Sequence, residues 1–344
     1  MREPEGRLAT IDTGPPRLGR GDVLHAGRRL AGRVWRTPVV RSDQLDALSG
    51  ARLWLKAENL QRGGSFKVRG ALLALERLAA SGSRGVVAQS TGNHAIAVAL
   101  AAREHRLPTT VVLPSDAAPT KVRRIRETGA EVRLVGTVLA ERVAVVEELR
   151  ERHGYDVVDP YDDPLVVAGQ GTATAELISQ VAEAGGRLDT VVVPIGGGSA
   201  IAGACLAAAG HDVAVVGAEP EAVPAFTAAL DAGRPVTVPL RYTLADGLRP
   251  DRIGDLPFRL AQGRVSTVLE VAEAAIADAL RAALLHARLL VEPAAATALA
   301  AAMSFAAEHG GDVGVLLTGG NVEPALVSSL LAGHGTGVPR TAMH

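Results

Sequence analysis

The stretch GGSFKVRGA, residues 63–71, carries a lysine in a chain that otherwise uses arginine for positive charge. Of the 36 basic residues, only Lys56, Lys67 and Lys121 are lysines, which leaves 33 arginines. The glycine pair, serine and aromatic residue before Lys67 make its setting still more specific. The lysine at position 67 therefore requires a reason that positive charge alone does not supply.

Length and composition indicate an ordinary globular protein with room for two domains. The chain has 344 residues, of which 47% are hydrophobic and 21% charged, values that argue against disorder. The formal net charge is -1, and no long run of one sign offers a footprint for nucleic acid or an anionic membrane. We therefore expect a small neutral or zwitterionic ligand, and neither nucleic acid nor membrane as partner.

Cysteine content and the first residues indicate a reducing compartment. Cys205 is the single cysteine, so no disulfide can form within the chain, and MREPEGRLAT lacks the apolar core of a secretory signal. The longest uncharged stretch, residues 190–210, contains PIGGGS in its middle, which excludes one continuous membrane-spanning helix. We expect a cytoplasmic protein without transmembrane segments.

Short β-branched runs alternate with alanine-rich helical patterns after an irregular beginning. Residues 1–20 are rich in Gly, Pro and Arg and are predicted to form a flexible arm. The expected strands lie in residues 84–90, 109–115, 131–136, 155–160, 190–196, 213–220, 265–271 and 313–320, and helical patterns separate them. This alternation predicts an α/β fold with mainly parallel sheets in two domains, whose cleft is the expected ligand site.

Several strand ends carry residues suited to binding anions. In VVVPIGGGSAIAG, Gly196, Gly197, Gly198 and Ser199 lie between a strand and a helix, so backbone N–H groups converge on one point. The spacing matches neither the dinucleotide fingerprint nor the P-loop. A phosphate site and a tight turn without ligand are about equally compatible with this triplet alone. Similarly, STGNHA at residues 90–95 offers either a carboxylate site or a simple helix cap.

Taken together, these segments resemble a known family. SFKVRGA, STGNHA, VAGQGT, PIGGGS, VEPAAA and TGGN occur in the order and at about the spacing of fold-type II pyridoxal-phosphate enzymes, nearest to the threonine/serine dehydratase and serine racemase group. The resemblance spans about residues 21–325. It implies a large cofactor-binding domain formed by residues 21–83 and 163–344, a small domain formed by residues 84–162, and a homodimer.

The resemblance implies a role for the lysine and for its neighbours. Lys67 would carry pyridoxal 5'-phosphate as a Schiff base, which requires a primary amine that can lose its proton, and arginine cannot do this. Phe66 would lie against the pyridine ring and Asn93 would bond the 3-hydroxyl. Thr318 would face the ring nitrogen, where a hydroxyl leaves the ring largely neutral. Two further sets are implied: the phosphate cradle of Gly196, Gly197, Gly198 and Ser199, and the substrate-carboxylate group of Ser90, Thr91, Asn93 and His94.

The implied reaction converts a 3-hydroxy amino acid such as L-threonine or L-serine to a 2-oxo acid and ammonia, with Lys67 as the general base. Two other activities on the same scaffold remain open. Racemisation is one, because Thr91 stands where racemases carry a serine that acts as an acid; its extra methyl group favours elimination. A β-replacement reaction is the other, although His94 stands where such synthases usually have threonine. An inactive cofactor-binding protein is disfavoured because Lys67 is retained.

Four departures from the family pattern leave the substrate open. Ile96 and Ala97 replace the usual Gln-Gly, Ser199 is the fourth residue of the phosphate loop, and EPAA follows Val291. Some relatives bind a divalent cation through a glutamate matching Glu219 and a nearby aspartate, but Ala225 takes the aspartate's place, so we predict no metal. We also expect no regulatory domain, and hence no feedback inhibition by isoleucine.

Overall fold

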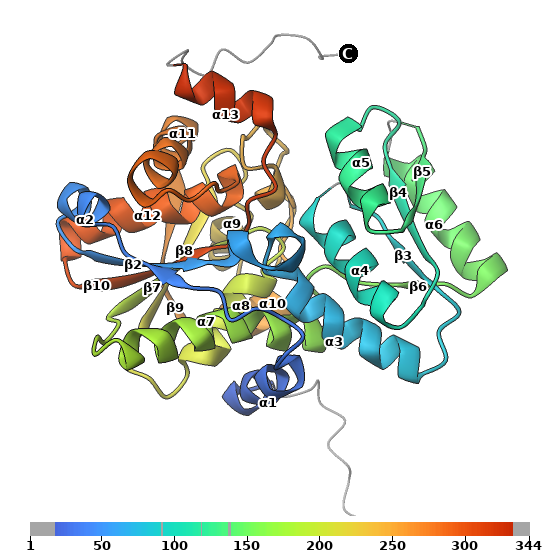
Figure 1. The fold of residues 1–344 in the computed structure, drawn as a ribbon, viewed down its shortest axis with the longest axis horizontal. Helices are drawn as coiled ribbons and strands as arrows, with labels where there is room; N and C mark the ends of the chain where they lie inside the picture. The colour runs from blue at the N-terminus through green and yellow to red at the C-terminus, as the bar shows by residue number, and fades with distance from the viewer. Residues whose placement is uncertain (1–17, 91, 118, 137–138, 333–344) are drawn as a thin grey trace, which may run out of the picture.

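The computed structural model describes residues 18–90, 92–117, 119–136 and 139–332, which form two sheets covered by helices (Figure 1). The larger sheet has the strand order β1-β2-β10-β7-β8-β9 and the smaller one β5-β4-β3-β6. Only the β1–β2 pair is antiparallel among these strand pairs. The strands are β1 Val39–Val40, β2 Arg52–Ala57, β3 Val86–Ala88, β4 Thr109–Leu113, β5 Glu131–Leu134, β6 Asp156–Val157, β7 Thr190–Pro194, β8 Ala214–Pro220, β9 Val265–Val271 and β10 Asp312–Leu317.

Helices connect most of these strands. The α-helices are α1 Arg20–Leu30, α2 Asp43–Ser49, α3 Lys67–Ala80, α4 Asn93–Glu104, α5 Pro119–Glu127, α6 Leu139–His153, α7 Pro164–Glu183, α8 Ser199–Ala208, α9 Ala225–Ala232, α10 Asp255–Ala261, α11 Glu273–Ala282, α12 Pro293–His309 and α13 Pro324–Leu331. The shorter helical segments are η1 Glu58–Leu60, η2 Arg62–Gly64, η3 Asp246–Leu248 and η4 Ala283–Ala287.

Two helical layers enclose the larger sheet. Figure 1 shows α7 and α8 on one face and α11 and α12 on the other. The central strands β7 and β10 are buried along their whole length, as expected for parallel strands covered on both sides. Alanine is abundant in α8 and α12, and small side chains let these helices lie close to the sheet.

The smaller sheet lies to one side with α4, α5 and α6 (Figure 1). All four of its strands fall between residues 86 and 157, and we propose that they form the small domain of residues 84–162, with residues 21–83 and 163–344 as the large domain. The expected arm of residues 1–20 lies mostly outside the described residues, and α1 already begins at Arg20.

The prediction of an α/β fold with mainly parallel sheets is confirmed, and each of the eight expected strands is present. Two strands were not predicted, β1 and β2. Strand β2 pairs with β10 along its whole length, although some 260 residues separate them along the chain. The pairing matters for the site, because β2 leads through η1 and η2 directly to Lys67.

Candidate active site

Backbone pairing between two distant segments places Lys67 at the end of the larger sheet. The Phe66 N–H donates to the Thr318 carbonyl oxygen (3.0 Å), and the Gly320 N–H donates to the Gly64 carbonyl oxygen (2.9 Å). Helix α3 begins at Lys67 immediately after this pairing. The side chain of Lys67 thus enters a cavity of about 540 Å³ that lies between the two sheets.

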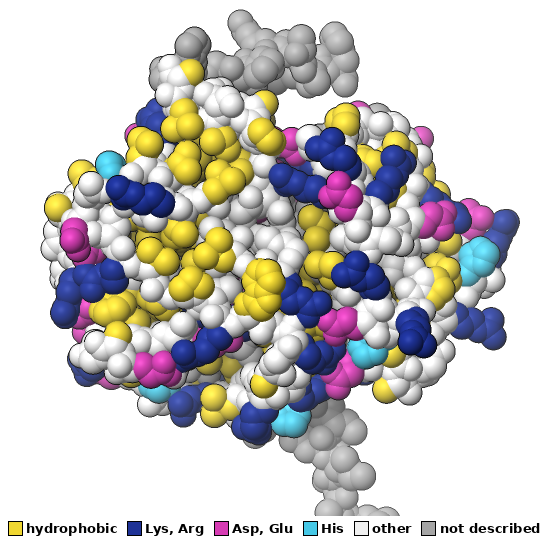
Figure 2. All heavy atoms as spheres, viewed as in Figure 1, with side chains coloured by type: hydrophobic (Ala, Val, Ile, Leu, Met, Phe, Trp, Pro, Cys, Tyr) yellow, Lys and Arg dark blue, Asp and Glu magenta, His cyan; other side chains and the backbone are white. Residues whose placement is uncertain are grey.

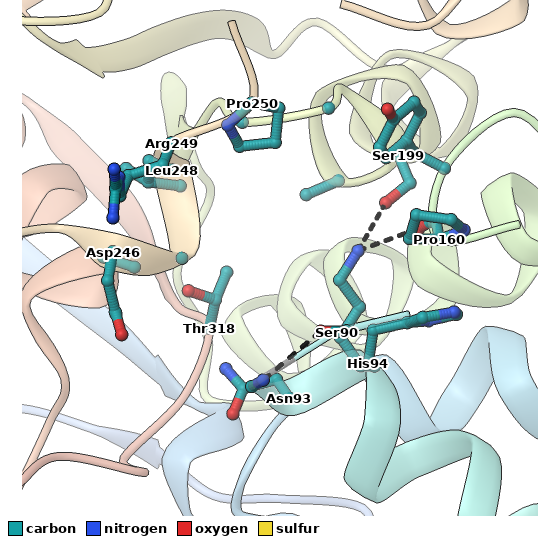
Figure 3. A pocket seen from close by; sticks show the side chains of 18 of the residues that line it. Ser90, Asn93, His94, Pro160, Ser199, Asp246, Leu248, Arg249, Pro250 and Thr318 are labelled. Atoms are coloured by element: carbon teal, nitrogen blue, oxygen red, sulfur yellow. Dashed lines mark hydrogen bonds between the residues drawn. The ribbon is translucent and has the colours of Figure 1, made fainter. Parts of the chain in front are cut away.

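The amine of Lys67 is held inside this cavity rather than in solvent. Its Nζ donates to the Pro160 carbonyl oxygen (2.9 Å) and lies 3.3 Å from Ser199 Oγ (Figure 3). Burial lowers the pKa of Lys67 from 10.5 to about 8, although the nearby carboxylates of Asp159 and Glu292 oppose the shift. This amine therefore loses its proton much more readily than a free lysine, as nucleophilic or base catalysis requires.

The glycine loop between β7 and α8 borders the same cavity. Gly198 has φ +99°, which glycine adopts without strain. A Cβ on Gly197 would lie 2.1 Å from the ring of Tyr161, so only glycine fits beneath that ring. Ser199 starts α8, a helix of 10 residues whose N-terminal N–H groups favour an anion. The loop therefore offers backbone N–H donors of the kind that bind a phosphate.

A chain of hydrogen bonds fixes the orientation of Asn93. Asn321 Nδ2 donates to both the Gly63 carbonyl oxygen (2.8 Å) and Asn93 Oδ1 (2.7 Å). Asn93 Nδ2 in turn donates to Glu292 Oε1 (2.6 Å). An amide nitrogen carries two N–H groups, so the second one of Asn93 has no partner among the described residues, and Asn93 lines the cavity. The cavity is therefore offered a donor, which suits an oxygen acceptor such as the 3-oxygen of the expected cofactor.

Glu292 belongs to the family motif VEPAAA, but the sequence alone indicated no role for it in the site. Burial, reinforced by the negative charge of Asp246, raises the pKa of Glu292 from 4.5 to about 7. Its carboxyl group is therefore partly protonated near neutral pH. Thr318, 3% exposed, also lines the cavity, and none of the described residues hydrogen-bonds its hydroxyl, which is left for a ligand.

The structure brings Ser90 and His94 to the cavity, but the imidazole of His94 has another function. His94 Nε2 lies 2.8 Å from the Val158 carbonyl oxygen, and burial lowers the pKa of His94 to about 3. The neutral ring thus fixes the segment before Pro160, and only the backbone N–H of His94 remains for a carboxylate. Ser90 Oγ accepts from the Gly92 N–H (3.2 Å). Thr91 lies outside the described residues.

Sequence reasoning missed two groups of cavity residues. Pro160 and Tyr161 follow β6, so the strand-end argument applied to the other loops would have found them. The second group lies at the rim and comes from α5 and from the loop around η3: Lys121, Arg124, Asp246 and Arg249. The signal for Lys121 was its rarity, since it is one of the three lysines in the chain.

A cluster of buried charges holds helix α3 in place. Arg69 lies two residues after Lys67, and its side chain is fully buried. Its guanidinium donates to both carboxylate oxygens of Glu58 (each 2.8 Å) and both of Glu176 (2.7 and 2.8 Å). Lys56 Nζ also donates to Glu176 (2.7 Å). Two positive and two negative groups thus balance, which buried charges require.

The described residues contain no group of three or more His, Cys, Asp or Glu side chains arranged to hold a metal. The carboxylate of Glu219 accepts from the N–H groups of Phe226 and Thr227 at the start of α9 (each 2.9 Å). Within the described part of the chain, no helix is both long and apolar enough to span a membrane.

Comparison with known proteins matches residues 30–319 to the family described as "Pyridoxal-phosphate dependent enzyme". L-threo-3-hydroxyaspartate ammonia-lyase of Pseudomonas sp is 40% identical over 316 residues, 91% of this chain and 98% of that protein. The crystal structure of threonine deaminase from T.th. has a TM-score of 0.84 and 40% identity, covering 89% of this chain and 99% of the other. Maize serine racemase also has a TM-score of 0.84, with 34% identity, covering 92% of this chain and 97% of the other.

These similarities agree with the geometry of the cavity. A buried lysine amine of lowered pKa, a glycine loop at a helix N-terminus and an oriented amide donor fit the amine-reactive carbonyl, the phosphate and the 3-oxygen of pyridoxal phosphate. The fold-type II assignment and the predicted cofactor are thereby confirmed. The chain belongs to the family of pyridoxal-phosphate dependent enzymes, and its cofactor is pyridoxal 5'-phosphate.

Proposed function

We propose that this protein is an ammonia-lyase that converts a 3-hydroxy amino acid, such as L-threonine or L-serine, to a 2-oxo acid and ammonia. One observation carries the proposal: the Lys67 amine lies in the same cavity as the glycine loop and the N-terminus of α4. The first can bind the cofactor phosphate and the second a substrate carboxylate. The relatives named threonine deaminase and hydroxyaspartate ammonia-lyase support the same class of substrate.

Several residues of this chain would hold the cofactor. Lys67 would be joined to it, Phe66 would pack on its ring, and Asn93 and Thr318 would bond the 3-oxygen and the ring nitrogen. The phosphate would lie in the loop formed by Gly196, Gly197, Gly198 and Ser199. Bound there, pyridoxal phosphate supplies an electron sink for the bond that breaks at the α-carbon. The Thr318 hydroxyl cannot protonate the ring as a carboxylate would.

The residues of the chain then act on the substrate. Ser90 and the N–H groups of Asn93 and His94 hold the α-carboxylate and orient the Cα–H bond. Lys67 Nζ, freed by the incoming amino group, removes the α-proton, for which its lowered pKa suits it. The β-hydroxyl leaves with a proton as water. Hydrolysis of the released enamine consumes one water molecule and gives the 2-oxo acid and ammonia.

Racemisation is the second candidate, and Thr91 is the residue on which it depends. Maize serine racemase is among the similar structures, and a threonine hydroxyl can still deliver a proton to the face opposite Lys67. The methyl group of threonine restricts that delivery. We therefore expect elimination to dominate, with slow racemisation beside it, and Thr91→Ala to suppress racemisation more than elimination.

The test is a product assay on the holoenzyme. Purified protein supplied with L-threonine or L-serine is expected to release 2-oxo acid and ammonia in equal amounts. The unreacted amino acid is then analysed for its configuration after incubation in heavy water. If the D-enantiomer accumulates faster than the 2-oxo acid, racemase becomes the better assignment. If neither product forms and added thiols react instead, β-replacement is favoured.

We also propose that the protein is cytoplasmic and forms a homodimer. The buried single cysteine fits a reducing compartment. Figure 2 shows hydrophobic side chains gathered on the large-domain side of the molecule. Trp35, Leu60 and Leu290 are 60%, 45% and 46% exposed. They lie near one another, because the two neighbours of Leu60 in the chain contact the other two residues. Gln61 Nε2 donates to the Trp35 carbonyl oxygen (2.8 Å), and Asn59 Nδ2 donates to the Leu290 carbonyl oxygen (3.1 Å). Such a surface is typical of a protein interface.

A further inference from the structure

Glu292 is a buried residue, 5% exposed, whose carboxyl group lies in the wall of the cavity. It immediately precedes α12, and its backbone N–H donates to the Gly319 carbonyl oxygen (2.9 Å). A Cβ on Gly319 would lie 2.5 Å from Glu292 Oε1, so the carboxyl group packs directly on the backbone of the loop after β10. Backbone packing therefore holds this carboxyl group at a fixed place beside Asn93.

The hydrogen bonds around Asn93 give the two carboxyl oxygens of Glu292 different tasks. The Gly63 carbonyl oxygen can only accept, so it fixes the amide of Asn321, whose nitrogen also donates to Asn93 Oδ1 (2.7 Å). Asn93 Nδ2 is thereby turned to Glu292 Oε1 (2.6 Å). Because Oε1 accepts this hydrogen bond, a proton on Glu292 is carried by Oε2. Protonation therefore leaves the bond to Asn93 intact and changes only the charge behind the amide.

Two charges from other elements act on Glu292 in opposite directions. Burial is the main cause that raises its pKa to about 7, Asp246 of η3 adds to the rise, and Lys121 of α5 opposes it. Lys121 is paired with Asp246 rather than with Glu292. The negative charge of Glu292 acts in turn on Lys67 of α3. Glu292 thus changes its charge near neutral pH inside the cavity that receives the cofactor.

We propose that Glu292 is a positioning residue for the cofactor: it holds the Asn93 amide with an N–H available to the 3-oxygen, and the charge of its carboxyl group sets how tightly that oxygen binds a proton. This inference rests on the proposed placement of the cofactor and deepens it. A nearby negative charge disfavours a second one, so ionised Glu292 favours the protonated 3-oxygen and neutral Glu292 favours its loss of the proton.

The first experiment titrates the visible absorption of the bound cofactor in the holoprotein without substrate, from about pH 5.5 to about pH 8.5. The absorption responds to charge near the cofactor, so the wild type should show an inflection near neutral pH. Glu292→Gln keeps an acceptor for Asn93 and removes the charge, so the protein should stay yellow and lose the inflection. Glu308→Gln, an exposed carboxyl group on the same helix α12, should retain it.

The pair of Lys121 and Asp246 tests whether Glu292 is the group that titrates. Asp246→Asn removes a negative charge and should move the inflection to lower pH, whereas Lys121→Met removes a positive charge and should move it to higher pH, each by about half a pH unit or more. Neither change should matter in the Glu292→Gln background, because both act through Glu292.

A cofactor analogue separates positioning from general support of the fold. Glu292→Met removes the acceptor for Asn93 and should weaken the binding of pyridoxal 5'-phosphate about 10-fold or more relative to Glu292→Gln. With 3-deoxypyridoxal 5'-phosphate, which lacks the 3-oxygen, the same substitution should cost less than about 3-fold. Equal losses for the two compounds would show that Glu292 only supports the local fold and would overturn the proposal.

The remaining outcomes also decide. An unchanged inflection in Glu292→Gln, or shifts in the same direction for Asp246→Asn and Lys121→Met, would refute the role of Glu292; should Glu292→Gln fail to fold, the direction of those two shifts still decides. If the absorption behaves as expected but no amino acid is deaminated, the proposed reaction fails and the positioning role stands. If deamination occurs but the wild-type absorption has no inflection, the role fails and the proposed function stands.

Discussion

Each of the three lysines occupies a place where arginine would act differently. Lys56 is fully buried and donates to Thr37, Glu176 and Gln180 at 2.7 to 2.8 Å, three acceptors for three ammonium protons. Lys67 reaches into the cavity with a lowered pKa. Lys121 pairs with Asp246 at the rim. In a chain that favours arginine so strongly, the rare residue type thus marks positions of specific chemistry.

Glu292 leads to a prediction at the residue scale about pH. Its pKa is raised from 4.5 to about 7, so the native state binds this proton more tightly than the unfolded chain does. The free energy of unfolding therefore falls as pH rises between these two values, and the contribution is constant outside them. Glu292→Gln should remove this slope. Urea unfolding of the holoprotein from about pH 5 to about pH 8 measures it.

The matched control for that slope is Glu308→Gln, an exposed glutamate on the same helix α12. Relative to wild type, Glu292→Gln should gain stability with rising pH and reach a plateau above about pH 7, whereas Glu308→Gln should show no such trend. A difference between Glu292→Gln and wild type that is the same at every pH would show that Glu292 does not hold the raised pKa.

Thr318 leads to a second residue-scale prediction. If its hydroxyl faces the ring nitrogen, Thr318→Val should weaken cofactor binding and slow turnover, while Thr318→Asp should change the visible absorption of the bound cofactor by favouring ring protonation. Both variants are measured by absorption spectroscopy and by 2-oxo acid release. Unchanged spectra and rates in both would mean that Thr318 only ends a strand.

Residues at strand ends were predictable, whereas the residues that orient them were not. The motifs predicted that Lys67, Asn93, Ser199 and Thr318 share one site, and all four line the same cavity. Ser199 and Thr318 follow parallel strands that end at the same edge of the larger sheet, whereas Asn93 follows β3 of the smaller sheet. The sequence indicated no role for Glu292, because its hydrogen bond with Asn93 joins residues that are 199 positions apart. Such tertiary contacts leave no local pattern in a single sequence.

At the scale of elements, helix α3 links the catalytic lysine to the buried charge cluster. Arg69→Met should lower the free energy of unfolding by about 3 to 5 kcal/mol, because the fully buried carboxylate of Glu58 would lose its charged partner. Arg77→Met is the control on the same helix. The side chain of Arg77 is 48% exposed and pairs with Asp163, and its loss should cost less than about 1 kcal/mol.

Urea unfolding of both variants measures these losses. The visible absorption of cofactor in Arg69→Met, recorded at low urea, adds a readout of the site: a displaced α3 should weaken cofactor binding while Arg77→Met binds normally. Equal stability losses in the two variants would contradict the anchoring role of the cluster.

The positions of the strands in the sequence were predicted more successfully than the neighbours of each strand in the sheet. β-branched runs such as TVVVP and VGVLL have strong strand propensity and are buried on both faces, so their sequence is sufficient. Strand β2 has the less distinctive sequence RLWLKA, and its place beside β10 is set by long-range packing. Its order in the sheet therefore could not be derived from local sequence.

At the scale of the whole molecule, the proposed dimer gives a testable mass. Light scattering after size-exclusion chromatography should return twice the mass of the chain. Leu290→Glu should shift the protein toward monomer, because it buries a charge if the surface around Leu290 is the interface. Leu134, which is also 46% exposed but lies on β5 of the smaller sheet, provides the control Leu134→Glu, which should remain dimeric. A monomeric wild type would refute the proposal.

The most direct test of the central claim is the measurement of 2-oxo acid formation by the cofactor-loaded wild type and by Lys67→Ala, with L-threonine, L-serine and L-threo-3-hydroxyaspartate as substrates. The wild type should be yellow and release one 2-oxo acid per ammonia from at least one of them. Lys67→Ala should lose the wild-type absorption band and reduce the rate on the order of 1,000-fold or more. A wild type that stays colourless with excess pyridoxal phosphate, or a Lys67→Ala variant that turns over at the wild-type rate, would contradict the account.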